Sequence, residues 1–107
     1  MKTYVIRRPH YWKNAQELEK SASLSARVGN EEMPDEVRWI RTYVVDEGDG
    51  TLGTVCIYQG VDEAAIKEHA RRSKMPAENL LPVVDTVVIR EDPKAEPQAE
   101  EQPEPVA

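Results

Sequence analysis

Two kinds of apolar pattern alternate along the chain, one with the spacing of strands and one with the spacing of helices. The segment Lys2–Arg8 is rich in β-branched and aromatic residues, which predicts a strand that Pro9 ends. Asn14, with Glu17 three residues later, is a capping-box pattern that predicts the start of a helix. Small and apolar residues then recur on one face at helical spacing, namely Ala15, Leu18, Ala22 and Ser25. We expect Gly29 to end this helix.

The second half of the chain predicts a hairpin, another helix and a last strand. Glu36–Asp46 has a strand composition, the two glycines within residues 47–50 favour a tight turn, and Thr51–Gln59 returns as a strand. Residues 62–74 predict a helix that begins at an aspartate N-cap and ends in a basic turn. Leu81–Arg90 is rich in valine and predicts the last strand.

The predicted order is strand, helix, strand, strand, helix, strand, which is the split βαβ pattern of an α+β protein. Such a chain forms a four-stranded antiparallel sheet with both helices on one face. Apolar residues nevertheless fall on both faces of each predicted strand, and two helices cover only one face. We therefore expect a second copy of the chain to cover the open sheet face, giving a homodimer. The alternative is an exposed face that simply tolerates some valine and tyrosine.

The last part of the sequence differs in composition from the rest. Residues 91–107 contain four of the eight prolines and six acids against one lysine, with almost nothing apolar. Such a segment buries too little surface to offset its ordering entropy, so it is predicted to be a disordered acidic tail after one domain over residues 1–90. The net charge of −6 therefore resides mostly in the tail, and the predicted domain is close to neutral.

Charge and cysteine content exclude some functions and indicate a compartment. The basic runs Arg7–Arg8 and Arg71–Lys74 are short and lie close to acids, unlike the basic stripe that neutralises nucleic-acid phosphates. No segment approaches the ~20 apolar residues of a membrane span, and the first residues lack an apolar signal-peptide core. The single cysteine, Cys56, excludes an internal disulfide and a multi-cysteine metal site. We expect a soluble cytoplasmic protein with no nucleic-acid or membrane partner.

Three stretches together resemble a known family. They are W-I-R-T-Y-V-V at Trp39–Val45, C-I-Y at Cys56–Tyr58, and Asp62–Leu80 with its E-H-A-R-R and M-P-A-E-N segments. In order and spacing they are similar to the DUF4242 family, and the likeness covers most of residues 3–90. The resemblance implies a ferredoxin-like fold, self-association and binding of a divalent metal such as nickel. It implies little about activity, because that is mostly undetermined in the family.

Two histidines are the candidate metal ligands. His69 falls on the histidine of the E-H-A stretch, so the resemblance makes it the first candidate, whereas His10 matches no such pattern. Nickel favours imidazole nitrogen, with carboxylates and water completing its coordination. Further ligands would have to come from acids elsewhere or from a partner subunit. His69 also lies near the apolar face of its helix, so it could instead bond a backbone carbonyl, or serve in proton transfer.

A second set of residues suggests a ligand site. Strand alternation places Trp39, Arg41 and Tyr43 on one face of the sheet, with Tyr58 beside them on the next strand. An apolar lining with a few converging polar groups is typical of a small-molecule pocket, which makes Arg41, Tyr43 and Tyr58 candidate binding residues. The alternative is structural, with Arg41 paired to Asp85 across the sheet.

The lone cysteine adds a third candidate. Cys56 could act as a nucleophile only beside a base such as His69, and a lone strand cysteine is more often an inert small hydrophobe.

Three classes of function remain open. The first is a small metal-binding protein, the second a ligand-binding or enzymatic dimer with a pocket near Arg41, Tyr43, Tyr58 and His69, and the third a non-catalytic dimeric module. The sequence contains no phosphate-binding glycine loop, nucleophilic triad or cofactor motif, so the question of an enzyme stays open. The resemblance favours the metal-binding class.

Overall fold

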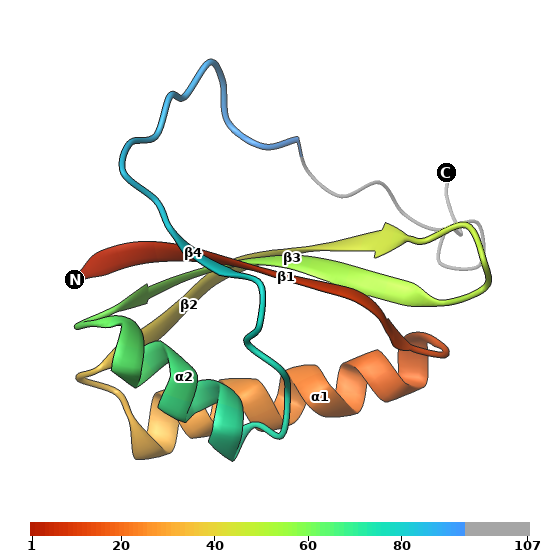
Figure 1. Cartoon of the computed structure of the whole chain (residues 1–107), viewed down its shortest axis with the longest axis horizontal. Helices are drawn as coiled ribbons and strands as arrows, with labels where there is room; N and C mark the ends of the chain where they lie inside the picture. The colour runs from red at the N-terminus through yellow and green to blue at the C-terminus, as the bar shows by residue number, and fades with distance from the viewer. Residues whose placement is uncertain (94–107) are drawn as a thin grey trace, which may run out of the picture.

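A twisted antiparallel sheet lies across two helices in the computed structural model, which describes residues 1–93 (Figure 1). The elements are β1 (Lys2–Trp12), α1 (Ala15–Arg27), a short π-helix η1 (Val28–Glu32), β2 (Val37–Asp46), β3 (Leu52–Gly60), α2 (Glu63–Arg72) and β4 (Leu80–Pro82). The strands lie in the order β2-β3-β1-β4, and every neighbouring pair is antiparallel. Both helices cover the same face of the sheet (Figure 1). The predicted α+β fold and its order of elements are confirmed.

Strand β1 is longer than the sequence predicts. It continues past Pro9 to Trp12, and an irregularity between Arg8 and Trp12 interrupts its pairing with β3. Proline has no N–H to donate to a neighbouring strand, and it is tolerated at this irregularity because the pairing is already interrupted there. The extension brings Trp12 over α1, where its indole Nε1 donates to Ser21 Oγ at 2.8 Å.

The two helices begin as predicted, and the first continues further. Asn14 Oδ1 accepts from the Glu17 amide at 2.9 Å, and Asp62 Oδ1 accepts from the Ala65 amide at 2.8 Å. The helical path after α1 does not end at Gly29 but continues through η1 to Glu32. A Cβ on Gly29 would lie 3.5 Å from His69 Nε2, so this glycine packs directly against the second helix.

Strand β2 contains one residue more than its partner. Trp39 is paired with Tyr58 and Arg41 with Ile57, so Ile40 is the extra residue of a β-bulge. Beyond the bulge the alternation of faces shifts by one position. Trp39 therefore shares the helix-covered face with Tyr58, whereas Arg41 lies on the opposite, open face. The predicted placement of all these side chains on a single face is wrong for this reason.

The last strand is much shorter than the predicted Leu81–Arg90. Strand β4 pairs with β1 from Tyr4 opposite Pro82 to Ile6 opposite Leu80, and the Val83 amide donates to Thr3 O at 2.8 Å. In this register the pairing reaches the beginning of β1 almost at once, so later residues have no strand to join. Residues 83–93 instead rise from β4 and form an arch over the open face of the sheet (Figure 1).

The core lies between the helices and the sheet. Its buried members come from every layer, namely Tyr4, Ile6, Val28, Met33, Val37, Cys56, Tyr58, Ala65 and Ile66. No helix within residues 1–93 is long and apolar enough to cross a membrane. Most of the predicted acidic tail lies outside the described residues.

Candidate functional site

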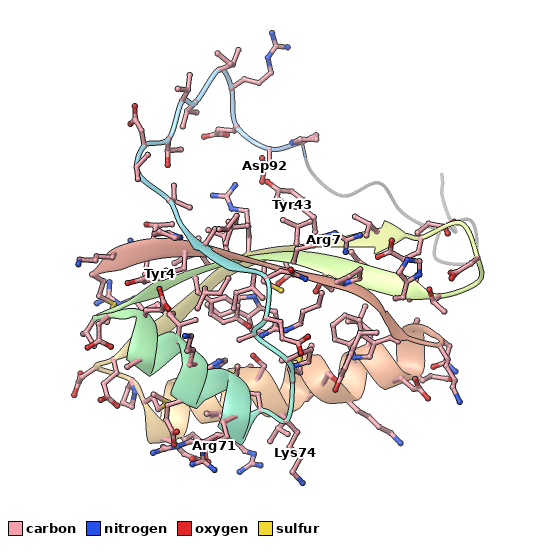
Figure 2. All side chains as sticks on the ribbon, viewed as in Figure 1. Tyr4, Arg7, Tyr43, Arg71, Lys74 and Asp92 are labelled. Atoms are coloured by element: carbon pink, nitrogen blue, oxygen red, sulfur yellow. The ribbon has the colours of Figure 1, made fainter. Side chains whose placement is uncertain are left out.

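The open face of the sheet holds two of the three predicted ligand-binding residues. Arg41 and Tyr43 both lie on β2 and bond to Asp92 at the far end of the arch, and Figure 2 shows Tyr43 extending toward it. The Arg41 guanidinium forms an ion pair with the Asp92 carboxylate, and the Tyr43 hydroxyl donates to it at 2.6 Å. These two donors, the Tyr43 hydroxyl first, lower the pKa of Asp92. The expected partner, Asp85, is not the one that Arg41 uses, because the chain leaves the sheet before reaching it.

The arch encloses a space against the open face of the sheet. A cavity of about 570 Å³ lies between residues 83–92 and the side chains of Ile40, Ile57 and Gln59. The apolar residues of the arch are largely exposed, with Val84 at 96 % and Ile89 at 81 %. The contact of Asp92 with β2 therefore fastens the arch without burying its apolar side chains.

Tyr58 and His69 form a different cluster, on the helix-covered face. Their rings lie 5.3 Å apart, the Tyr58 hydroxyl is 3.2 Å from Ser25 Oγ, and His69 Nε2 is 3.0 Å from the Ser25 carbonyl oxygen. Since a carbonyl only accepts, His69 carries its proton on Nε2. Burial lowers the pKa of His69 and raises that of Tyr58. His69 is thus a neutral, buried residue bonded to a backbone carbonyl, which is the structural alternative that the sequence left open.

Cys56 lies on the same face but makes different contacts. Its Sγ is 3.3 Å from Thr42 Oγ1, 3.4 Å from Thr54 Oγ1 and 3.5 Å from the Arg8 guanidinium. The imidazole of His69 is bonded instead to Ser25, so the structure gives no Cys–His pair. A base next to the sulfur is what nucleophilic use of Cys56 would need.

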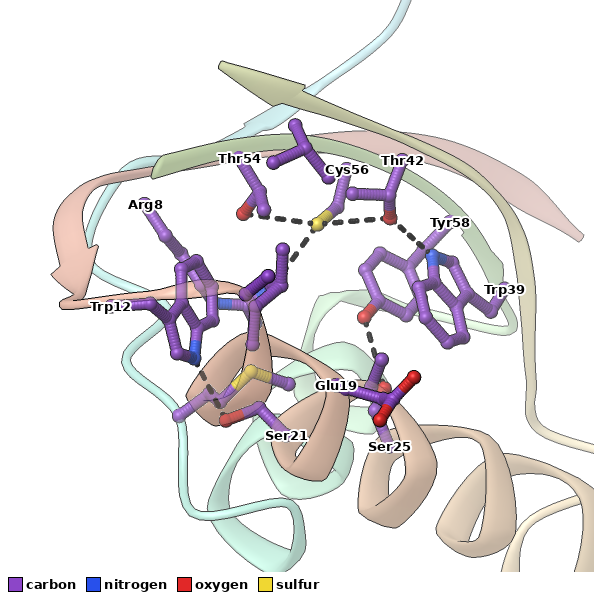
Figure 3. A pocket seen from close by; sticks show the side chains of 15 residues that line it. Arg8, Trp12, Glu19, Ser21, Ser25, Trp39, Thr42, Thr54, Cys56 and Tyr58 are labelled. Carbon is purple, nitrogen blue, oxygen red and sulfur yellow. Dashed lines mark hydrogen bonds between the residues drawn. The ribbon is translucent and has the colours of Figure 1, made fainter. Parts of the chain in front are cut away.

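An apolar cavity opens beside this cysteine, between α1 and the sheet (Figure 3). Its volume is about 370 Å³, and both tryptophans of the chain, Trp12 and Trp39, line it. Helix α1 supplies the opposite wall with small residues, including Ala22 and Ser25. This space lies on the helix-covered face, so Arg41 and Tyr43 have no part in it.

Arg8 is a candidate site residue that the sequence reasoning missed. It lines the same cavity, and it is buried to 2 % exposure. Strand alternation already contained the signal, because Arg8 follows Tyr4 and Ile6 on the face of β1 that turns inward. The adjacent Arg7 points to the other face and forms an ion pair with Glu47 at 2.8 Å.

His10 lies apart from His69, near the C-terminal end of β1. It is exposed, its Nδ1 lies 2.9 Å from Asp49 Oδ2, and its Nε2 lies 3.8 Å from Glu47 Oε1. Its φ of 54° is in the left-handed region that few non-glycine residues adopt. Hydrogen bonds from Thr51 lower the pKa of Asp49, and the Arg7 guanidinium lowers that of Glu47. Both carboxylates are therefore ionised beside an accessible imidazole.

The surroundings of His10 suit a metal ion better than those of His69. Within residues 1–93 no group of three His, Cys, Asp or Glu side chains is arranged to hold an ion. His69 is buried, with its Nε2 engaged by the Ser25 carbonyl, and a charge close enough to affect it is that of the cationic Arg8. His10 has the donor types that nickel accepts, imidazole nitrogen and carboxylate oxygen, although Arg7 engages both oxygens of Glu47.

Comparison with known proteins agrees with this fold. The crystal structure of SCO4226 from Streptomyces coelicolor A3(2) matches with a TM-score of 0.62 and 14 % sequence identity, covering 79 % of this chain and 99 % of that one. Comparison with curated proteins gives no match.

A family model described as nickel responsive protein SCO4226-like matches residues 4–83. The predicted resemblance to DUF4242 agrees with this result in fold and in the association with nickel, although that label itself is not confirmed. The chain belongs to the nickel responsive SCO4226-like family.

Proposed function

We propose that this protein binds nickel reversibly as a small nickel-responsive protein, and that His10 is its principal ligand. The family match over residues 4–83 supports the nickel association. The observation that carries the choice of site is the exposed His10 imidazole with the ionised Asp49 carboxylate 2.9 Å away.

His10 is favoured over His69 because an incoming ion can reach it. A metal at His69 Nε2 would displace the bond to the Ser25 carbonyl and would enter a region that is 1 % exposed. The buried guanidinium of Arg8 also acts against positive charge on His69. At His10 the charge balance is more favourable, because Asp49 and Glu47 are both negative.

The proposed site is simple and weak. His10 would supply one nitrogen and Asp49 one oxygen, and nickel supplies the Lewis-acid chemistry of a divalent ion when it is bound. Glu47 could join only by releasing Arg7, which currently donates to both of its oxygens. Water would take the remaining coordination positions, so we expect a dissociation constant of about 10–100 μM, where release is easy.

Calorimetric titration of nickel into the full chain tests this proposal, with His10→Ala and His69→Gln as paired variants. We expect His10→Ala to weaken nickel binding at least about tenfold and Asp49→Asn to weaken it as well, while His69→Gln leaves it unchanged. Nickel affinity that survives in His10→Ala and disappears in His69→Gln would reverse the assignment. Absence of saturable binding in the unmodified protein would remove the direct nickel role.

The same proposal includes a homodimer, formed through the open face of the sheet. The support is the set of exposed apolar residues on the arch, since Val84, Val87, Val88 and Ile89 are between 72 % and 96 % exposed. Exposed apolar side chains gathered on one segment are typical of interfaces. A second copy would bury the arch and the apolar part of the sheet beneath it.

A further inference from the structure

Arg8 is a buried cation with incomplete bonding. Its Nε donates to the Pro76 carbonyl at 2.7 Å, and one terminal nitrogen reaches the Cys56 sulfur at 3.5 Å. The other terminal nitrogen, Nη2, has no hydrogen-bond partner among the described residues. Within residues 1–93 no carboxylate lies within ion-pair distance of Arg8. A thiol is a weak acceptor, so it does not replace one. Buried guanidinium groups are ordinarily paired, because an uncompensated charge away from water is strongly unfavourable.

The unpaired guanidinium borders a space large enough for a ligand. The cavity between α1 and the sheet has a volume of about 370 Å³, near the lower end of ligand pockets. Figure 3 shows Arg8 and Trp12 on one side of this space and Tyr58 and Trp39 on the other, with Cys56 between them on the sheet. Thr42 and Thr54, which also line it, bond to the cysteine and leave the rest of the lining largely apolar.

We propose that this cavity binds a small monocarboxylate with an aromatic or aliphatic body, whose carboxylate pairs with the Arg8 guanidinium once Nη2, which is enclosed in the ligand-free protein, turns toward the space. A carboxylate matches the planar guanidinium in charge and in geometry. The apolar body would lie between the two tryptophans and the small residues of α1. Glu19, the one acid in the lining, is exposed on α1, and it disfavours ligands with a second negative charge.

This inference is independent of the proposed nickel site. His10 lies at the exposed, irregular end of β1 and Asp49 in the turn between β2 and β3, whereas Arg8 lies on the helix-covered face of β1. The two sites share no residue. Loss of nickel binding in His10→Ala therefore says nothing about the cavity, and failure of carboxylate binding leaves the nickel proposal intact.

Tryptophan fluorescence gives a direct readout, because both tryptophans of the chain line the cavity. We would titrate the full protein with phenylpropionate and octanoate, and with their neutral amides as matched controls. We expect each acid to change the emission saturably, with a dissociation constant of about 1 mM or tighter. The amides have the same shape without the charge, so we expect them to bind at least about tenfold more weakly.

Three variants connect the signal to the cavity. Arg8→Met removes the charge but keeps an apolar side chain of similar length, and we expect it to abolish the preference for the acid over the amide. Arg7→Met, on the other face of the same strand, should leave binding unchanged. Ala22→Leu, from the α1 wall, should weaken both acid and amide by occupying the space.

Stability separates a ligand anchor from a purely structural arginine. We expect Arg8→Met to retain or raise the melting temperature of the ligand-free protein, because it removes an uncompensated buried charge. Phenylpropionate should raise the melting temperature of the unmodified protein and not that of Arg8→Met. Equal binding of acid and amide, wild-type binding by Arg8→Met, or no binding of either acid up to about 10 mM would each overturn the proposal.

Discussion

The burial of His69 has a consequence for stability that follows from its pKa. Burial lowers this pKa from its usual value of about 6.5, with the Arg8 charge acting in the same direction and the Ser25 carbonyl against it. The folded protein therefore keeps His69 neutral at a pH at which the unfolded chain already binds a proton. In that window the unfolded state gains protons first, so the free energy of unfolding falls as the pH falls.

The expected result is a loss of stability on acidification from about pH 7 to pH 5, with a slope of at most about 1.4 kcal/mol per pH unit from this residue. His69→Gln, which keeps an N–H donor for Ser25, should remove most of that slope. Urea unfolding at several pH values measures it, with His10→Gln as the exposed control. A slope that is unchanged in His69→Gln would contradict the buried, neutral state of this histidine.

Some of these residues could be assigned from the sequence and others could not. Alternation in β1 and β3 places Arg8, Cys56 and Tyr58 correctly on one face, because these strands are regular where those residues occur. The hydrogen-bond partner of His69 could not be predicted. It depends on how closely α1 approaches α2, and that distance is set by packing across more than forty residues of chain.

At the scale of elements, the bulge at Ile40 decides which residues meet. The sequence Trp39–Tyr43 alternates without any local sign of an extra residue, such as a glycine. Simple alternation therefore puts Trp39, Arg41 and Tyr43 together, and it fails after the first of them. The extra residue allows Trp39 to stack on Tyr58 at 6.2 Å while Arg41 points to the opposite face.

Deleting residues in β2 tests this account of the bulge. Deletion of Ile40 removes only the extra residue, so every later side chain keeps its face, and we expect a loss of no more than about 2 kcal/mol of stability. Deletion of Thr42 leaves the bulge but moves Tyr43 to the core face, and we expect it to cost about 3 kcal/mol or to prevent folding. Urea unfolding, with near-ultraviolet circular dichroism of the Trp39–Tyr58 pair, gives both results. Equal damage from the two deletions would contradict the bulge.

The short β4 shows the same dependence on non-local pairing. Its valine-rich sequence is typical of a strand as far as Arg90, so composition alone predicts a strand of that length. A strand also needs a partner, and β1 offers only its first residues beyond the pairing of Tyr4 with Pro82. The register between two distant segments therefore sets the end of β4, and the composition of β4 alone does not.

At the scale of the whole molecule, residues 83–93 leave the sheet and form the arch. The exposed apolar side chains of the arch are the reason to expect a dimer. Asp92 fastens its far end to Arg41 and Tyr43, so the exposed valines are presented in a fixed place over the sheet. The helices already cover the other face. Within residues 1–93, most of the large exposed apolar side chains therefore lie on the arch or on the open face, where a second copy would bury them.

Light scattering during size-exclusion chromatography tests the dimer, and we expect twice the mass of one chain. The double variant Val87→Glu and Ile89→Glu places two charges in the proposed interface, and it should shift the protein to the mass of one chain because unpaired buried charge is costly. Val61→Glu, at an exposed valine before α2, is the matched control and should leave the mass unchanged. Asp92→Ala releases the end of the arch. We expect it to weaken the dimer less than the double variant does, because it makes the segment less ordered without placing charge in the interface. A single-chain mass for the unmodified protein at micromolar concentration would refute the dimer, and the exposed arch would then need another partner.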